Sequence, residues 1–246
     1  MSRATRGLML AALIAIGQPA RADEAPDAAL ACGPGAPLTL AVRLDYRVTA
    51  SRGLLSLSGE GTVTYRRTGD SYAMTSTLRA ASLFEARQTS DGRVGPDGLV
   101  PLAFTQQTSR RPLLRVDFDW ASGKVAFSRG GARVPTRPQM QDRLSLLFHL
   151  AWRHRAQPGA AIIELPVAGQ SSVTTYAISV GEPAEVTVPA GTFDTVKFER
   201  EHPGRGDVLE VWLAPALCSM PVRLRFTDER GTVIEQQLVA VRQLDP

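Results

Sequence analysis

The sequence contains few of the side chains that bind metals or act as general bases. It has three histidines, two cysteines and no asparagine in 246 residues. His149 and His154 are five residues apart in a segment with helical periodicity, which places them about 140° apart around a helix rather than on one face. His202 lies in a Pro-Gly loop. These positions predict no metal centre and no cofactor.

Recognisable catalytic motifs are also missing. The stretch GQSSV at 169–173 lacks the final glycine of a nucleophile elbow, and there is no phosphate loop or dinucleotide-binding fingerprint. Asp117 and Asp119 share one face of a predicted strand, about 7 Å apart, as a glycosidase pair could. Their alternation with apolar neighbours, beside Arg115, favours an exposed outer face. A hydrolase acting on glycan or lipid through these acids and the histidines is therefore one hypothesis, without a recognised site.

The first residues have the order of a secretory signal peptide. Arg3 and Arg6 precede the apolar run 8–16, and an Ala-Arg-Ala sequence ends at Ala22. That run is too short for the roughly 20 residues that span a bilayer as a helix, and no later segment is long enough. We expect cleavage after Ala22, a periplasmic location and no transmembrane segment in the mature chain. The remaining chain is predicted to divide into a flexible leader, 23–37, and a single domain, 38–246.

The charge balance argues against nucleic acid as a partner. Loss of residues 1–22 removes three arginines and no acid, so the formal net charge falls from +4 to +1. A chain this close to neutral has no electrostatic excess for a polyanion. The arginine-rich stretch 129–155 is typical of a solvated surface, although it could also face anionic lipid or glycan.

Two cysteines in an exported chain commonly form a disulfide. A bridge between Cys32 and Cys218 would close a long loop, and chain-entropy arguments give it roughly 4–5 kcal/mol of stabilisation. The alternatives are two unpaired thiols or lipidation of Cys32, which follows an Ala-Leu-Ala sequence but lies beyond several acidic residues and a proline.

Apolar and polar residues alternate with period two over most of the chain after residue 38, which predicts strands. Leu44, Tyr46 and Val48, for example, share one face. Only 139–155 has helical spacing, with apolar residues at Leu144, Leu147, Phe148, Ala151 and Trp152. Because a large antiparallel sheet has to curl, close or pack on another element, we expect an all-β fold. It would be a strongly curved antiparallel sheet or incomplete barrel of about 10–13 strands, with this amphipathic helix packed on its concave face.

Aromatic side chains are the candidates for an apolar ligand site. Such residues usually form plain core, but a cavity beside the helix would suit a hydrophobic guest. The residues expected to converge inside the sheet are Tyr46, Phe118, Trp120, Phe148 and Trp152.

The C-terminal third carries a combination of short motifs. They are Pro-Ala-Gly-Thr-Phe at 189–193, Trp-Leu-Ala-Pro at 212–215 and a strand led by Pro221, with Asp-Gly-Leu-Val-Pro upstream at 97–101. Together they resemble the exported proteobacterial family catalogued as domain of unknown function 3108, over most of 40–242. This resemblance implies an exported protein of this fold without an agreed activity. The Trp-x-x-Pro and proline-led strands also resemble periplasmic lipoprotein carriers of the half-barrel type, at the level of fold alone.

Three functions fit these observations. The first is a non-enzymatic envelope protein that binds an apolar, lipid-like molecule or an envelope protein. The second is the hydrolase described above. The third is a structural or assembly factor that recruits partners through exposed strand edges. The ligand, the partner and the oligomeric state are not determined by the sequence.

Overall fold

Fifteen strands form one continuous sheet in the part of the chain that the structure describes. The structure is a computed structural model that describes residues 30, 32, 38, 41–80, 84–109, 111–201 and 207–245. The strand order is β8-β7-β6-β5-β4-β3-β2-β1-β15-β14-β13-β12-β11-β10-β9, and neighbours are antiparallel except for the short parallel pair β9 and β10. The expected signal peptide 1–22 and most of the leader 23–37 lie outside the described residues.

The elements alternate long strands with short connections. The first half of the sheet consists of β1 (Val42–Arg52), β2 (Leu55–Thr68), β3 (Ser71–Ala80), β4 (Phe84–Gly95), β5 (Gly98–Thr108), β6 (Arg111–Asp119), β7 (Lys124–Phe127) and β8 (Arg133–Pro135). The second half consists of β9 (Gln141–Asp142), α1 (Ser145–Ala156), β10 (Ile162–Ala168), β11 (Val173–Val188), β12 (Gly191–Glu201), β13 (Val208–Ala214), the 3-10 helix η2 (Pro215–Leu217), β14 (Met220–Thr227) and β15 (Val233–Gln243).

The predicted all-β class with one helix and a curved sheet is confirmed, but the strand count exceeds the predicted 10–13. Two of the additional strands, β8 and β9, are only three and two residues long, too short to show period-two alternation. Strand β11 extends over sixteen residues. Its pairing register shifts between Val180 and Pro183, so the strand bends there without ending.

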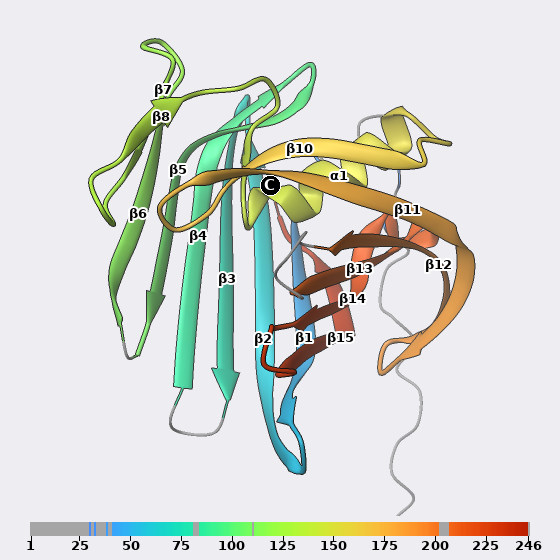
Figure 1. The fold of residues 1–246 in the computed structure, drawn as a ribbon. Helices are drawn as coiled ribbons and strands as arrows, with labels where there is room; N and C mark the ends of the chain where they lie inside the picture. The colour runs from blue at the N-terminus through green and yellow to red at the C-terminus, as the bar shows by residue number, and fades with distance from the viewer. Residues whose placement is uncertain are drawn as a thin grey trace, which may run out of the picture.

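The sheet curls around α1 without closing into a barrel within the described residues. Strands β2 to β6 form one wall and β12 to β15 another, while β10 and β11 cross in front of the helix (Figure 1). Strand β9, at one end of the sheet, contacts β5, where the Gln141 side-chain amide donates a hydrogen bond to the Leu99 carbonyl at 2.9 Å. The helix therefore lies inside the curve of the sheet, which surrounds it.

Helix α1 begins later than predicted, at Ser145 instead of about 139. Residues 139–144 lead the chain into the helix. They contain the short strand β9 and Gln139, whose backbone has a positive φ of 55°. The helix ends at Ala156, just before Pro158 and Gly159, which do not favour its continuation. Within the described residues, no helix is long and apolar enough to cross a membrane.

The buried residues of α1 cover more of the helix surface than the single apolar stripe predicted from the sequence. Leu147 and Trp152 of that stripe are only partly buried, whereas Leu146, His149 and Leu150 outside it are buried. The reason is tertiary. The sheet packs behind the helix and β9 lies beside it, so most sides of the first two turns are covered.

The disulfide expected between Cys32 and Cys218 is present, with the two Cα atoms 5.0 Å apart. It attaches the segment before β1 to the residues between η2 and β14. Leu30, close to the bridge in sequence, is buried in the core. Two residues of the expected leader are therefore held against the domain by a covalent bond and by apolar packing.

Candidate functional site

A cavity of about 340 Å³ lies on the concave face of the sheet, beside the first turn of α1. Its walls come from β2, β3 and β4 on one side and from β11 to β15 on the other. The apolar side chains that line it are Val63, Leu78, Phe84, Ala86, Leu144, Leu146, Leu147, Leu209, Leu224, Phe226 and Ile234. Residues far apart in the chain meet here only because the sheet curls.

Burial of the lining residues shows where the cavity opens. Val63, Leu146 and Leu224 are buried and form its inner part. Phe226 and Ile234 are only partly buried, and Phe84 is 39% exposed. We call the part of the concave face around Phe84, Phe226 and Ile234 the open end, and the part covered by α1 the helix end. Apolar side chains at the open end therefore face solvent.

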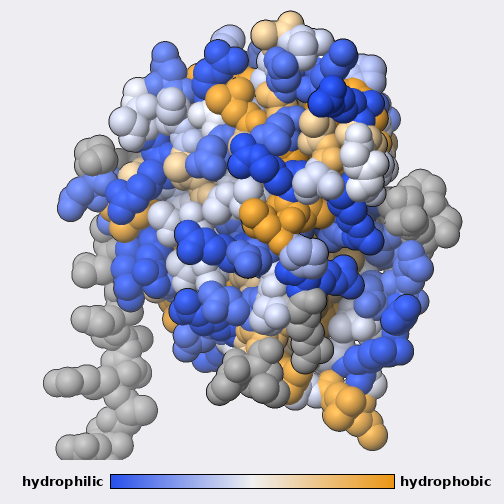
Figure 2. Space-filling view, turned by 90° about the vertical axis from the view of Figure 1, so that its left-hand side faces the viewer, coloured by the Kyte–Doolittle hydropathy of each residue, from blue (hydrophilic) through white to orange (hydrophobic). Residues whose placement is uncertain are grey.

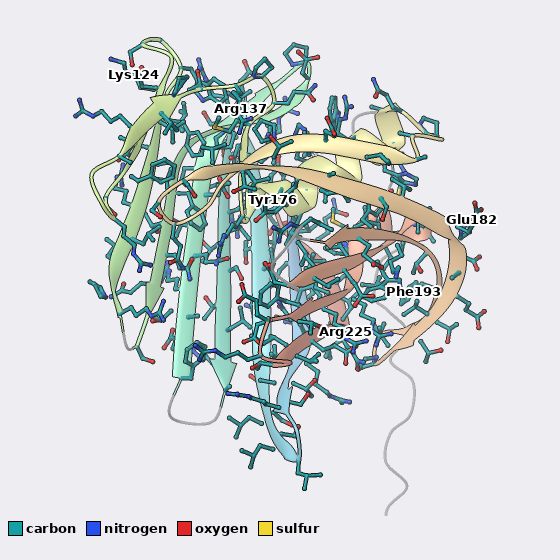
Figure 3. The ribbon with its side chains drawn as sticks, in the orientation of Figure 1. Lys124, Arg137, Tyr176, Glu182, Phe193 and Arg225 are labelled. Atoms are coloured by element: carbon teal, nitrogen blue, oxygen red, sulfur yellow. A yellow bond between two sulfur atoms is a disulfide. The ribbon has the colours of Figure 1, made fainter. Side chains whose placement is uncertain are left out.

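Arg200 and Asp207 are the charged side chains of the cavity that pair with each other. The Arg200 guanidinium lies 3.1 Å from an Asp207 carboxylate oxygen and stacks on the Tyr176 ring at 4.1 Å. Tyr176 and Arg225, both labelled in Figure 3, mark the part near the helix and the part further from it. The Arg225 side chain lies 3.8 Å from Glu210. The exposed Arg143 also lines the cavity, but most of the lining side chains are apolar.

A buried polar network holds the start of α1 against the sheet. The Asp142 carboxylate accepts hydrogen bonds from the backbone N–H groups of Leu144 and Ser145, both at 2.8 Å. Its other oxygen accepts a hydrogen bond of 2.6 Å from the Ser90 hydroxyl, which lies 3.0 Å from the Tyr72 hydroxyl. Desolvation raises the pKa of Asp142 to about 6 despite these hydrogen bonds. Asp142 thus connects the start of the helix to Ser90 of β4, which in turn contacts Tyr72 of β3.

The middle of α1 is held by a second contact. The Leu99 N–H donates to His149 Nδ1 at 3.3 Å, and the His149 and Trp152 rings lie 5.6 Å apart. A Cβ at Gly98, where φ is +99°, would come within 2.7 Å of His149 Nδ1, so only glycine fits. Burial, followed by the nearby charge of Arg153, lowers the pKa of His149 to about 3 and keeps the ring neutral. The Asp97-Gly98 turn was visible in the sequence, but its contact with the helix was not.

The five aromatic residues predicted to form a ligand site do not line this cavity. Phe148 stacks on Tyr65 with ring centroids 4.7 Å apart, and the Tyr46 hydroxyl donates to the Pro221 carbonyl at 2.8 Å.

The other members of that group pack elsewhere. Phe118 stacks on Trp120 at 6.3 Å, the Trp120 indole N–H donates to Pro101, and Trp152 contacts His149. All five pack within or against the hydrophobic core, and their role in ligand binding stays a prediction.

The described acids and histidines considered for hydrolysis each contact a different partner. Asp117 forms an ion pair with Arg115 at 2.6 Å. Asp119 is fully solvated and accepts a hydrogen bond from the Ser122 backbone N–H at 2.9 Å. His154 makes an edge-to-face contact with Phe198, and His202 lies outside the described residues. Among the described residues, no group of three or more His, Cys, Asp or Glu side chains is arranged to hold a metal ion.

Two further hollows differ from this cavity in character. One of about 440 Å³ lies at β5 and β6 and includes Arg111, Arg129 and Gln170. The other, of about 610 Å³, is lined mainly by polar and charged residues of β1, β2 and β15, such as Arg43, Glu60 and Arg242. The cavity beside α1 combines a buried apolar interior with an apolar opening, and we therefore take it as the candidate site.

Comparison with known proteins places the chain in a family. The model of the family "Protein of unknown function (DUF3108)" matches residues 45–239. The chain belongs to this family. The resemblance inferred from its motifs is thus confirmed. No curated protein matches the chain significantly.

Solved structures support the fold. The chain is similar to a β-barrel-like protein of the DUF1849 family from Brucella abortus, with 14% identity and a TM-score of 0.57, covering 84% of this chain and 99% of the other. It also matches a domain assigned to outer membrane lipoprotein sorting from Vibrio parahaemolyticus, with 7% identity and a TM-score of 0.28, covering 82% and 84% of the two chains.

Proposed function

We propose that this protein is exported to the cell envelope and binds the apolar part of a lipid-like molecule in the cavity beside α1. The observation that carries the proposal is the cavity itself, whose interior is buried and apolar and whose opening is lined by partly exposed Phe84, Phe226 and Ile234. Exposed apolar side chains around a hollow are typical of ligand-binding grooves.

The size and polarity of the cavity favour an apolar chain over a compact polar molecule. Its volume of about 340 Å³ lies at the lower end of small-molecule sites. Arg200 is already neutralised by Asp207 and stacked on Tyr176, so it offers no free charge. An alkyl chain would gain free energy by removing the apolar rim from water, at roughly 25 cal/mol per Å² of apolar area.

The envelope location is supported by two independent features. The N-terminal residues have the order of a signal peptide, and Cys32 and Cys218 are joined in a disulfide, a bond that persists in oxidising compartments. Determination of the N-terminus of the protein from the periplasmic fraction should find Asp23 as the first residue. Retention of Met1 in the cytoplasmic fraction would contradict export.

Ligand binding is tested by filling the cavity. Ala86→Trp places an indole at the cavity wall, and Ala240→Trp places one in the polar hollow of β15 as a matched control. We expect a dansylated fatty acid to bind the wild type and the control equally, and to bind Ala86→Trp at least tenfold more weakly. Equal binding by all three, or no binding by the folded wild type, would contradict the proposal. Lipid mass spectrometry of the purified protein then identifies the natural ligand.

A further inference from the structure

The turn between β1 and β2 carries the two most exposed large apolar side chains among the described residues, Leu54 and Leu55, with a third exposed leucine close by. We define the tip as residues 52–57. Relative to the fully exposed residue, Leu54 is 105% exposed, Leu55 78% and Leu57 59%. Exposed leucines occur singly on many proteins, but three within four residues form a continuous apolar surface.

The tip projects beyond the rest of the sheet. Strand β2 pairs with β3 only from Gly59 onward, so residues 55–58 have no neighbour on that side in the described pairing. A two-residue loop of Gly53 and Leu54 closes the hairpin, and Gly53, with a φ of +59°, supplies the left-handed conformation that such a loop needs. The apolar cluster at the lower extremity of the molecule in Figure 2 corresponds to this end.

The sheet register connects the tip to the open end of the cavity. Phe226 pairs with Ile234, Ile234 with Ala50, and Ala50 with Leu57, in one row across four adjacent strands. Directly paired residues in an antiparallel sheet point to the same face. Leu57, and Leu55 two residues before it, therefore continue the concave apolar face from the cavity opening out to the tip.

We propose that the tip inserts into the surface of a lipid bilayer and sets the open end of the cavity against the membrane. A bilayer accepts apolar side chains without requiring a complementary shape. A second protein, by contrast, needs about 800 Å² of matching surface per partner, which a narrow hairpin turn does not offer. The insertion is shallow, at the boundary between headgroups and acyl chains, because the backbone polar groups of the turn have to stay hydrated.

Charge does not drive the docking. Arg52 is the basic residue of the tip, and Asp228 of the neighbouring turn lies close enough to interact with it electrostatically. The long Arg52 side chain reaches the headgroup layer while its aliphatic part follows the leucines. Binding to vesicles should therefore depend little on salt or on the fraction of anionic lipid.

The experiment is flotation with phosphatidylcholine vesicles, with and without phosphatidylglycerol. The test variant combines Leu54→Ser, Leu55→Ser and Leu57→Ser. The control combines Leu102→Ser, Ile162→Ser and Val239→Ser, which replaces three exposed apolar residues elsewhere. We expect the wild type and the control to float equally with both vesicles, and the bound fraction of the tip variant to fall at least tenfold with an unchanged melting temperature.

Membrane docking by the tip is a separate proposal from ligand binding in the cavity, and different results would contradict each. The tip variant should still bind the dansylated fatty acid in the absence of vesicles, and Ala86→Trp should still float. A wild type that does not float, or a tip variant that floats as well as the wild type, would overturn membrane docking alone. Leucine-dependent dimers in sedimentation velocity would also overturn it, in favour of a second copy as the occupant.

Discussion

The two ends of the concave face are built from the same strands but are filled differently. At the helix end, Phe148 stacks on Tyr65, Asp142 is hydrogen-bonded to Ser90, and His149 accepts from Leu99. At the open end, the same sheet leaves apolar side chains partly exposed around a cavity. No described segment packs over the leucines of the tip, and two of them, Leu54 and Leu55, are the most exposed large apolar residues that the structure describes.

The residues that contribute most to stability therefore lie at the helix end, whereas the candidate site opens at the other end. The helix end has densely packed apolar side chains and the hydrogen-bonded carboxylate of Asp142, although His149 Nε2 is buried without a partner. The open end retains apolar surface that contributes little to folding and is available for binding. Substitutions at the two ends should therefore affect different measurements.

The largest expected effect comes from removing the disulfide. Cys32→Ala frees the segment before β1 from the start of β14, a strand that contacts α1. Because the bridge closes a loop with a sequence separation of 186, chain entropy predicts a loss of roughly 4–5 kcal/mol in the free energy of unfolding. Urea denaturation measures the loss. Fatty-acid binding by the folded variant should be unchanged, since the bridge is not part of the cavity.

Truncation of one phenylalanine at each end compares the two regions directly. Phe148→Ala should lower the free energy of unfolding by about 3–5 kcal/mol, because the side chain is fully buried and stacked on Tyr65. Phe226→Ala at the open end should lower it by about 1–2 kcal/mol, since that side chain is partly exposed. Fatty-acid binding should weaken in Phe226→Ala. Equal destabilisation by the two variants would mean that the ends do not differ as described.

His149 should make the helix end sensitive to acid. Its pKa is about 3 in the folded protein and about 6.5 when unfolded, so the unfolded chain takes up a proton between these values and the folded chain does not. Stability should therefore fall by about 2.5 kcal/mol from pH 7 to pH 4.5 through this group. His149→Asn keeps an acceptor for the Leu99 N–H and does not titrate. Chemical denaturation at several pH values should show the acid loss reduced by that amount.

Asp142 should change the pH dependence of stability in the direction opposite to His149. Burial raises its folded pKa to about 6, above its ordinary 3.8, so the folded state holds the proton more tightly than the unfolded state. The contribution of Asp142 should therefore become more favourable by about 2 kcal/mol as the pH falls from 7 to 4.5. Asp142→Asn removes this compensation and should steepen the acid loss caused by His149. A shallower acid dependence in Asp142→Asn would show that the sign is wrong.

The smallest expected effect is at the exposed side of α1. Arg153 is only partly buried, and Arg153→Ala should change the free energy of unfolding by about 0.5 kcal/mol or less. The charge of Arg153 helps to lower the pKa of His149, so the variant should also titrate His149 at a slightly higher pH, as NMR can measure. A loss as large as that of Phe148→Ala would contradict the assignment of stability to the buried side chains.

Much of the fold was predictable because its rules are local. Alternation identified most strands, and spacing located one helix between Pro138 and Pro158. The candidate site was less accessible. The five aromatic residues chosen from the sequence pack with the core, while residues such as Val63 and Ile234, which line the cavity, have no distinguishing pattern. An apolar residue on the inner face looks the same in sequence whether the helix or a cavity covers it.

Local patterns are enough to predict most of the strands, one helix and a pair of cysteines suited to an oxidising compartment, because periodicity and composition act over a few residues at a time. Which part of the concave face α1 covers depends on how the whole sheet curls. The reason is that curvature accumulates over fifteen strands and includes register shifts, such as those at Asp45/Tyr46 and Asp91/Gly92. The curled sheet brings Asp142 to Ser90 and His149 to Gly98, over sequence separations that no local pattern encodes.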